Sequence, residues 1–489
     1  MKQTSLLRFA PGLAAILALA VPAVLAVPPI LRAAQENATG SLVLQGGTLI
    51  DGTGTPPVPD AMVVVQADRI ACAGPRDACE IPEGSRILDL AGRWIIPGLV
   101  DAHVHFSQTG WVDGRPDVVD LRDRYPYQAV MAGQKSAPER YLRAYLCSGV
   151  TSVFDVGGYP WTWGLHERGE TDPLSPRISA AGPLLSTIDF WLNLPAERQF
   201  IHMAGDSVVR DAIAYHAAHA TDAVKIWYIM PPQPPDSARA SGLVRLAGEE
   251  TSRRGIPLFV HATGLWEAKD AVRAGAGLLV HSVFNEPVDD EFLGLAKEAG
   301  VLYTPTLTVW EGYRDVFQDR FDGSRYPLEC VDPETQSKVG VGVIPQERLP
   351  AVASDSTFVA LQRQRFQNGL ENARRVFEAG IPVVVGTDAG NPGTLHGPSI
   401  YREMELLVEA GLAPMDVLVA ATLNGARAMG REEELGTVLE GKLADLIVLG
   451  ADPLADIRNV RSVEWVIKAG VLHARDELLP RLVPSSEGG

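Results

Sequence analysis

Apolar runs of strand length alternate with helical patterns through the middle of the chain, over residues 95–435. This alternation is typical of α/β folds with parallel strands. The runs that predict strands cover residues 95–101, 150–156, 177–181, 222–228, 258–261, 278–283, 302–306 and 382–388. Helices are expected between them, for example over residues 138–148, 207–220, 264–274, 291–299 and 358–379. Eight such units predict a (β/α)8 TIM barrel. An open doubly wound sheet is the alternative, but the sequence has no Gly-rich phosphate loop after an early strand, which that fold would favour.

The two segments that flank this region have a different pattern. Residues 41–94 and 436–478 contain short apolar strands separated by Gly- and Pro-rich turns. We expect them to form one small β domain built from both chain ends, beside a barrel over 95–435. Within the barrel, residues 108–134 and 309–354 are long insertions, and these are expected at the barrel mouth, where long loops usually carry function.

The N-terminus has the pattern of an export signal. Lys2 and Arg8 precede 23 uncharged, mainly apolar residues. This predicts a signal peptide over residues 1–26, followed by a linker over residues 27–40. An uncleaved anchor is the alternative, since 23 apolar residues can span a bilayer, although three prolines weaken a long helix there. In both cases the folded part is expected outside the cytoplasm, either periplasmic, secreted or membrane-anchored.

Composition narrows the class of protein. The 489 residues are 46% hydrophobic and 21% charged, which excludes a disordered or fibrous chain. The net charge of −17 repels phosphate backbones, so nucleic acid is not expected as a partner. Four cysteines are too few for a disulfide-built scaffold. Export nevertheless favours a Cys72–Cys79 disulfide, with two free small side chains as the alternative; Cys147 and Cys330 belong to no visible motif.

Residues with metal-ligating side chains stand at or near the ends of several predicted strands. They are His103, His105, Lys225, His261, His281 and Asp388. His103 and His105 share one strand face, because side chains on a strand repeat every two residues. Taken singly, each has an ordinary interpretation: a buried core histidine, a lysine that extends to water, or an aspartate that caps a helix. Together they converge, because the carboxyl ends of barrel strands meet at one mouth.

Lys225 decides how many metal ions the group can hold. It lies within the apolar run Ala223–Trp227, where a bare ammonium is costly to bury. A reaction of its amine with CO2 would give a carbamate (N6-carboxylysine), an anion whose two oxygens can bridge two ions. Four histidines, a carbamate and an aspartate suit two divalent ions, and mixed nitrogen and oxygen ligands favour zinc.

The order His-x-His, Lys, His, His, Asp resembles the amidohydrolase superfamily, in its binuclear subgroup with a carboxylated lysine. The segments Ile95–His103, Ala420–Gly430 and Gly436–Leu446 are also similar to that family, and the resemblance covers about residues 41–475. It implies a zinc hydrolase with a TIM barrel and a split β-sandwich domain. It further implies a more buried ion on His103, His105 and Asp388. A more exposed ion would lie on His261 and His281, with carboxylated Lys225 and a hydroxide as bridges.

The expected function is hydrolysis of an amide bond in a small substrate, a dipeptide or an N-acyl amino acid. The resemblance is strongest to the imidazolonepropionase-related branch, which includes metallo-dipeptidases. The hydroxide would attack the carbonyl, and Asp388 would accept its proton and pass it to the leaving amine. Alternatives are a cyclic-amide hydrolase similar to hydantoinases or dihydroorotase, a deaminase, or a barrel without activity. Membrane association is expected only with an uncleaved N-terminus, and a homo-oligomer stays open.

Substrate contacts are predicted from position alone. Tyr228, His396 and His166 follow predicted strands and are candidates, with simple packing as the alternative. The two insertions carry aromatic and arginine side chains: Trp111, Arg115, Arg122, Arg124, Tyr125, Tyr127, Trp310, Tyr313, Arg314, Arg320 and Tyr326. Arginines there would hold a free carboxylate by paired hydrogen bonds; the alternative is that they only offset the acidic surface.

Overall fold

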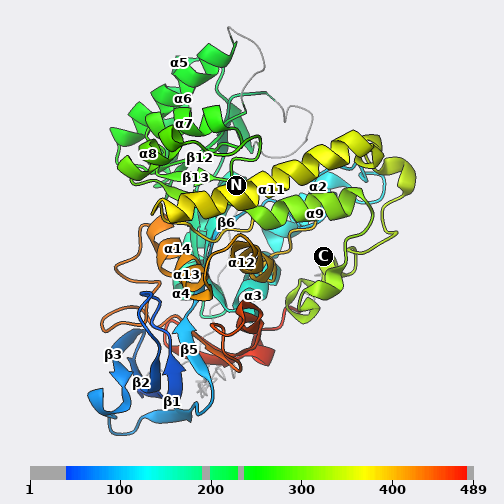
Figure 1. Ribbon diagram of the computed structural model, residues 1–489. Helices are drawn as coiled ribbons and strands as arrows, with labels where there is room; N and C mark the ends of the chain where they lie inside the picture. The colour runs from blue at the N-terminus through cyan, green and yellow to red at the C-terminus, as the bar shows by residue number, and fades with distance from the viewer. Residues whose placement is uncertain (1–39, 190–198, 230–235, 482–489) are drawn as a thin grey trace, which may run out of the picture. The chain divides into compact units, whose positions relative to one another are not determined.

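Residues 40–189, 199–229 and 236–481, which the computed structural model describes, form a mixed α/β structure (Figure 1). The predicted signal peptide, and the predicted linker up to residue 39, lie outside the described residues. Within the described ranges, no helix combines the length and the apolar character that crossing a bilayer requires.

One mixed sheet combines strands from both ends of the described chain, in the order β17-β16-β15-β5-β1-β2-β3, with β4 beside β1. Its strands are β1 (Leu42–Leu49), β2 (Val58–Gln66), β3 (Arg69–Pro75), β4 (Arg86–Asp89), β5 (Trp94–Pro97), β15 (Leu446–Leu449), β16 (Val463–Lys468) and β17 (Val471–Ala474). The two sets meet where β5 pairs antiparallel with β15 and Ile96 lies opposite Ile447. Leu44, Val63 and Leu446 belong to one buried apolar cluster, so side-chain packing joins the two segments as well.

The remaining strands are parallel and form two sheets. One has the order β6-β7-β8 and the other β10-β9-β11-β12-β13-β14. Their bounds are β6 (Leu99–Val104), β7 (Val150–Asp155), β8 (Arg177–Ala180), β9 (Leu184–Ser186), β10 (Phe200–His202), β11 (Val224–Trp227), β12 (Leu258–His261), β13 (Leu278–Val280) and β14 (Leu302–Thr304). Buried apolar residues from these strands and from the surrounding helices share the largest core cluster.

Helices follow most of the parallel strands. They are α2 (Tyr127–Ser136), α3 (Glu139–Cys147), α4 (Leu165–Thr171), α5 (Asp206–Ala218), α6 (Asp236–Ser252), α7 (Leu265–Arg273), α8 (Asp290–Glu298), α9 (Leu307–Phe317), α10 (Pro333–Gln336), α11 (Ser356–Glu378), α12 (Ser399–Glu409), α13 (Pro414–Ala420) and α14 (Leu423–Ala428). The helices predicted over 138–148, 207–220, 264–274, 291–299 and 358–379 are confirmed as α3, α5, α7, α8 and α11.

The apolar run 382–388 joins the two parallel sheets without being a regular strand. On one side Tyr303 of β14 forms a parallel bridge with Val383. On the other side the backbone N–H of Ala102 in β6 donates to the carbonyl of Val385 at 3.0 Å. The carboxyl end of this segment therefore lies beside the carboxyl end of β6.

The second insertion contains helix α9 and packs along α11 (Figure 1). A disulfide between Cys147, the last residue of α3, and Cys330 ties this insertion to the rest of the chain. No pattern in the sequence predicted that bond. The predicted Cys72–Cys79 disulfide is confirmed, with an S–S distance of 2.02 Å.

Candidate metal centre and substrate cavity

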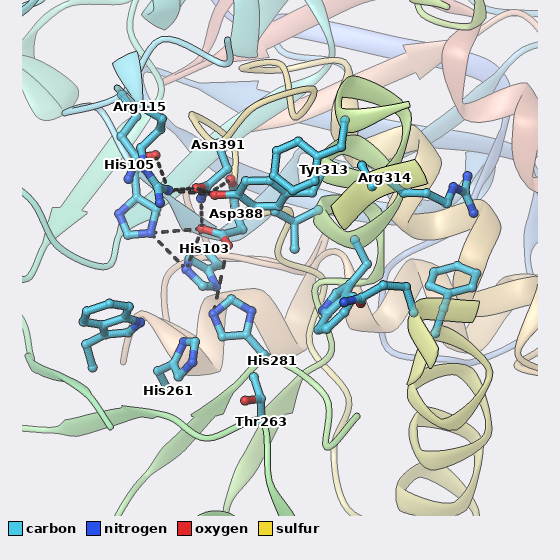
Figure 2. A pocket seen from close by; sticks show the side chains of 18 of the residues that line it. His103, His105, Arg115, His261, Thr263, His281, Tyr313, Arg314, Asp388 and Asn391 are labelled. Atoms are coloured by element: carbon cyan, nitrogen blue, oxygen red, sulfur yellow. Dashed lines mark hydrogen bonds and ion pairs between the residues drawn. The ribbon is translucent and has the colours of Figure 1, made fainter. Parts of the chain in front are cut away.

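A cavity of about 650 Å³ opens at the carboxyl ends of the parallel strands. All six residues predicted as metal ligands line it: His103, His105, Lys225, His261, His281 and Asp388. Adjacent parallel strands bring them together, because side chains at the carboxyl ends of such strands face one edge. Figure 2 shows the imidazoles of His103 and His105 directed at the carboxylate of Asp388.

Three ligand-type atoms lie close enough to share one ion. Nε2 of His103 is 3.3 Å from Nε2 of His105, and these two nitrogens lie 3.2 and 3.0 Å from Oδ1 of Asp388. Ligand atoms about 2.0–2.2 Å from a tetrahedral zinc ion lie about 3.3–3.6 Å apart. Nε2 of His281 approaches Oδ2 of the same carboxylate at 4.0 Å. A ligand atom of His281 also lies within 4.8 Å of those of His103 and Asp388, so the Asp388 carboxylate lies between the His103–His105 pair and His281.

The tautomers and charges of these groups suit a cation. Nδ1 of His105 donates to the carbonyl of Gly157 at 2.6 Å, which leaves the Nε2 lone pair facing Asp388. Burial lowers the pKa of His103 and of His261 to about 3, so both imidazoles are neutral at pH 7. Burial alone would raise the pKa of Asp388, but the neighbouring histidines outweigh it and hold that pKa well below its usual range.

Lys225 is the most unusual member of the group. It lies within β11 opposite Phe259 of β12, and its side chain is only 2% exposed. Burial lowers the pKa of its amine to about 7, so a large share of the amine is uncharged at neutral pH. Only an uncharged amine can add CO2, and the structure therefore offers Lys225 in the form that carbamate formation requires.

Three residues at or beside this site have a strained backbone. His281 and Asp388 have φ values of 74° and 62°, in the left-handed region that side chains other than glycine seldom adopt. Thr306, with φ 48°, is also left-handed, and its Oγ1 is 2.5 Å from Nδ1 of His281. Such strain persists only where the surrounding contacts enforce it, and it is typical of functional sites. One of these contacts is the bond from the Asp388 backbone N–H to the carbonyl of His103, at 2.7 Å.

A polar network that the sequence did not reveal supports Asp388. Nδ2 of Asn391 donates to Oδ1 of Asp388 at 2.8 Å. Oδ1 of Asn391 in turn accepts from Tyr313 Oη at 2.6 Å and from a guanidinium N–H of Arg115. Arg115 and Tyr313 come from the two insertions, so the insertions fix the orientation of this amide (Figure 2). Asn391 follows Asp388 by three residues, and no local pattern distinguishes it from an ordinary loop residue.

Comparison with known proteins identifies the family. A model of the amidohydrolase family matches residues 94–472, which is most of the chain. The chain belongs to the amidohydrolase family. It is therefore a hydrolase that acts on carbon–nitrogen bonds of small-molecule substrates, as the resemblance in the sequence implied.

Relatives of this amidohydrolase differ in the reactions that their names give. A 5-methylthioadenosine/S-adenosylhomocysteine deaminase from Symbiobacterium thermophilum is 26% identical, over 84% of this chain and 85% of the relative. An imidazolonepropionase from Rhizobium meliloti is 25% identical, over 82% of this chain and 87% of that relative. A solved structure of a Xaa-Pro dipeptidase with bound methionine has a TM-score of 0.67 and 23% identity, over 89% of this chain and all of that one. This last likeness concerns the fold.

The three predicted substrate contacts have other partners in this amidohydrolase, and none of them lines the cavity among the described residues. Oη of Tyr228 donates to Oδ2 of Asp270 at 2.8 Å. The ring nitrogens of His396 bond to Tyr145 Oη at 2.9 Å and to the carbonyl of Gln108 at 2.9 Å. Nδ1 of His166 bonds to the carbonyl of Ile178 at 3.0 Å. These hydrogen bonds hold all three side chains away from the cavity lining, and their assignment to the substrate stays a prediction.

Arginines at the cavity are largely paired with acidic residues. Arg115 makes a two-point ion pair with Asp117, with distances of 3.0 and 2.9 Å. Arg314 and Arg320 both bind Oδ1 of Asp315, at 2.9 and 3.0 Å. The pairing favours the interpretation that these arginines balance acidic side chains over the interpretation that they wait for a substrate carboxylate.

Proposed function

We propose that this amidohydrolase cleaves the amide bond of a dipeptide or an N-acyl amino acid at a centre of two divalent ions, with zinc as the expected metal. The observation that carries the proposal is the convergence of four imidazoles, one carboxylate and a buried lysine on one cavity. A site for a single ion would not need Lys225 as a further ligand in this cavity. The similarity in fold to a Xaa-Pro dipeptidase supports the choice of substrate.

The residues divide between two ions in this proposal. His103, His105 and Asp388 would hold the first ion, His261 and His281 would hold the second, and Lys225, as a carbamate, would supply an oxygen to each. Bound there, the ions would supply a hydroxide at neutral pH and polarise the scissile carbonyl. Asp388, buried and ionised, accepts a proton at its carboxylate oxygen and returns it to the departing amine. The products are a carboxylate and an amine.

The fold behind the site is, in this proposal, a (β/α)8 barrel over 95–435 with a β-sandwich domain from 41–94 and 436–478. Hydrogen bonds from the segment 382–388 to β14 and to β6 support closure on one side of the barrel. On the other side, the backbone N–H of Asp222, two residues before β11, donates to the carbonyl of Ala180 in β8 at 3.3 Å. The mixed sheet of both chain ends supports the composite domain.

We also propose that the enzyme works outside the cytoplasm, in the periplasm or secreted. The two disulfides support this location, because disulfides persist mainly in oxidising compartments. The apolar N-terminal segment with its two preceding basic residues supports it independently.

A hydrolysis screen with metal analysis tests the proposal. Zinc-loaded protein is expected to hold about two ions per chain and to hydrolyse a dipeptide or an N-acyl amino acid faster than a hydantoin. Deamination of 5′-methylthioadenosine is the second candidate, since a deaminase is among the relatives. Ammonia release from that nucleoside, without amide cleavage, would replace the proposal by the second candidate.

The same screen tests how the substrate is recognised. A dipeptide is compared with its C-terminal amide. A tenfold loss of kcat/KM on amidation, about 1.4 kcal/mol, would show that a free carboxylate is bound. The ion pairs of Arg115, Arg314 and Arg320 favour a smaller loss.

A further inference from the structure

We infer that the outer part of the cavity binds a bulky apolar group, an aromatic ring or a long acyl chain, on one side of the scissile amide. The inference rests on the proposed amide hydrolysis and names the class of substrate within it. Its basis is the wall that helices α9 and α11 build beside the histidine cluster.

Aromatic side chains from both helices line that wall, together with arginine and glutamine side chains. Trp310 and Phe317 of α9 and Phe358 and Phe366 of α11 line the cavity, and all four are only partly buried. Trp227, at the end of β11, lines it as well. Figure 2 places Tyr313 beside Asp388 and Asn391, while Arg314, on the same helix, points away from the histidines. Helix α9 therefore extends from the reactive centre outward, and its apolar side chains continue the cavity in that direction.

The wall is fixed relative to the reactive centre. Thr306 contacts His281, and α9 begins at the next residue. The first two backbone N–H groups of α9, from Leu307 and Thr308, donate to the buried carboxyl group of Glu403 at 3.0 and 2.7 Å. The ring of Trp310 packs on that of Phe284, with centroids 4.2 Å apart. A preformed apolar surface of this kind binds a rigid apolar group at a low cost in ordering.

Size and charge point to the same class of substrate. The cavity of about 650 Å³ has the volume of roughly 20 water molecules at about 30 Å³ each, more than a dipeptide of two small residues needs. Arg115, a partly buried guanidinium at the cavity, is already paired with Asp117, and Arg363 of α11 is exposed to solvent, where ionic attraction is weak. Apolar contact is therefore the main source of binding energy that this wall offers.

Three substrates with a common amide test the inference: N-acetyl-L-alanine, N-(2-naphthoyl)-L-alanine and N-acetyl-L-tryptophan. At least one of the two bulky compounds is expected to exceed N-acetyl-L-alanine by about 30-fold or more in kcat/KM. Phe366→Ala and Phe358→Ala should each reduce that ratio by about tenfold. The matched control is Leu361→Ala on the same helix, at a side chain that is 46% exposed and does not line the cavity; it should keep the ratio.

The outcomes separate this inference from the proposed function. If all three amides are cleaved at similar rates, or if both phenylalanine variants keep the ratio, the inference is wrong although amide hydrolysis stands. If no amide is cleaved, the proposed function fails, and calorimetry with zinc-loaded protein decides the inference. In that case 2-naphthoate should bind about tenfold or more tightly than acetate, and equal binding of the two acids overturns the apolar wall.

Discussion

Asn391→Ala is expected to lower kcat/KM by about 10- to 150-fold while leaving the metal content unchanged. Asn391 and Asp388 are 4% and 6% exposed, and the amide donates a 2.8 Å hydrogen bond to the carboxylate. A buried hydrogen bond to a charged acceptor contributes about 1.5–3 kcal/mol, which is one to two powers of ten in rate when the reaction depends on it. Loss of this bond leaves Asp388 free to turn away from the direction in which it must exchange a proton.

Tyr313→Phe provides an internal check of the same reasoning. Its hydroxyl donates to Oδ1 of Asn391 at 2.6 Å, and Arg115 remains as a second donor to that oxygen. The loss should therefore be that of one neutral hydrogen bond, about 0.5–1.5 kcal/mol or two- to tenfold. Because both side chains act on Asp388 through one amide, the double variant should lose little more than Asn391→Ala alone.

The assay is kcat/KM of zinc-loaded protein on the best amide substrate, with zinc measured in every preparation. Asn459→Ala is the control, because its amide donates to the carbonyl of Asp452 and, within the described residues, the side chain does not line the cavity. Full zinc content with kcat/KM within threefold of wild type for Asn391→Ala would refute the supporting role. Fully additive losses in the double variant would refute the shared route through the amide.

Four further predictions concern single groups. Lys225→Ala should abolish turnover and lose zinc, with partial rescue of activity by acetate; activity at the wild-type level without a carbamate would contradict the bridging role. Asp388→Asn should lower kcat by about 10²- to 10⁴-fold, and a loss under tenfold would remove it from proton transfer. A Cys147→Ser/Cys330→Ser double variant should lose up to about 5 kcal/mol of unfolding free energy in urea, since the bond closes a span of 183 residues. Burial raises the pKa of Glu403 to about 8. The neutral carboxyl therefore contributes its full stability below pH 4.5, and this contribution is lost as the pH rises through 8. Glu403→Gln should flatten that decline in the free energy of unfolding, and an unchanged slope would contradict the assignment.

The strand ends that carry the predicted ligands were readable from the sequence because each combines an apolar run with one polar residue. His261 and His281 follow such runs, and both line the cavity. The run 382–388 was also recognisable as an apolar segment, but its irregular pairing, through isolated bridges, was not. Gly386 passes so close to its neighbours that a Cβ there would lie 2.5 Å from Thr304 and 2.8 Å from His103. Such a close approach depends on three-dimensional packing, which local patterns do not encode.

Hydrogen bonds between side chains on distant loops could not be predicted. Asn391 gains its role from Arg115, 276 residues away, and from Tyr313, 78 residues away. The direction of a side chain on a loop is equally invisible. His396 follows Asp388 on one loop, as expected, but its ring turns toward Tyr145 because two hydrogen-bond partners satisfy it there. The sequence thus predicts which residue types stand at the strand ends. The hydrogen bonds that orient these residues depend on tertiary contacts, which the sequence does not show.

The pairing of β5 with β15 has a consequence for synthesis. During synthesis Ile96 is made before its partner Ile447, which lies about 350 residues later in the chain. At a translation rate of about 5–20 residues per second, that interval lasts about 20 to 70 s. During this time the edge of β5 and its apolar side chains have no partner strand, and an unpaired edge of this kind is prone to aggregation. The nascent enzyme is therefore expected to depend on a holding chaperone until its last hundred residues have been made.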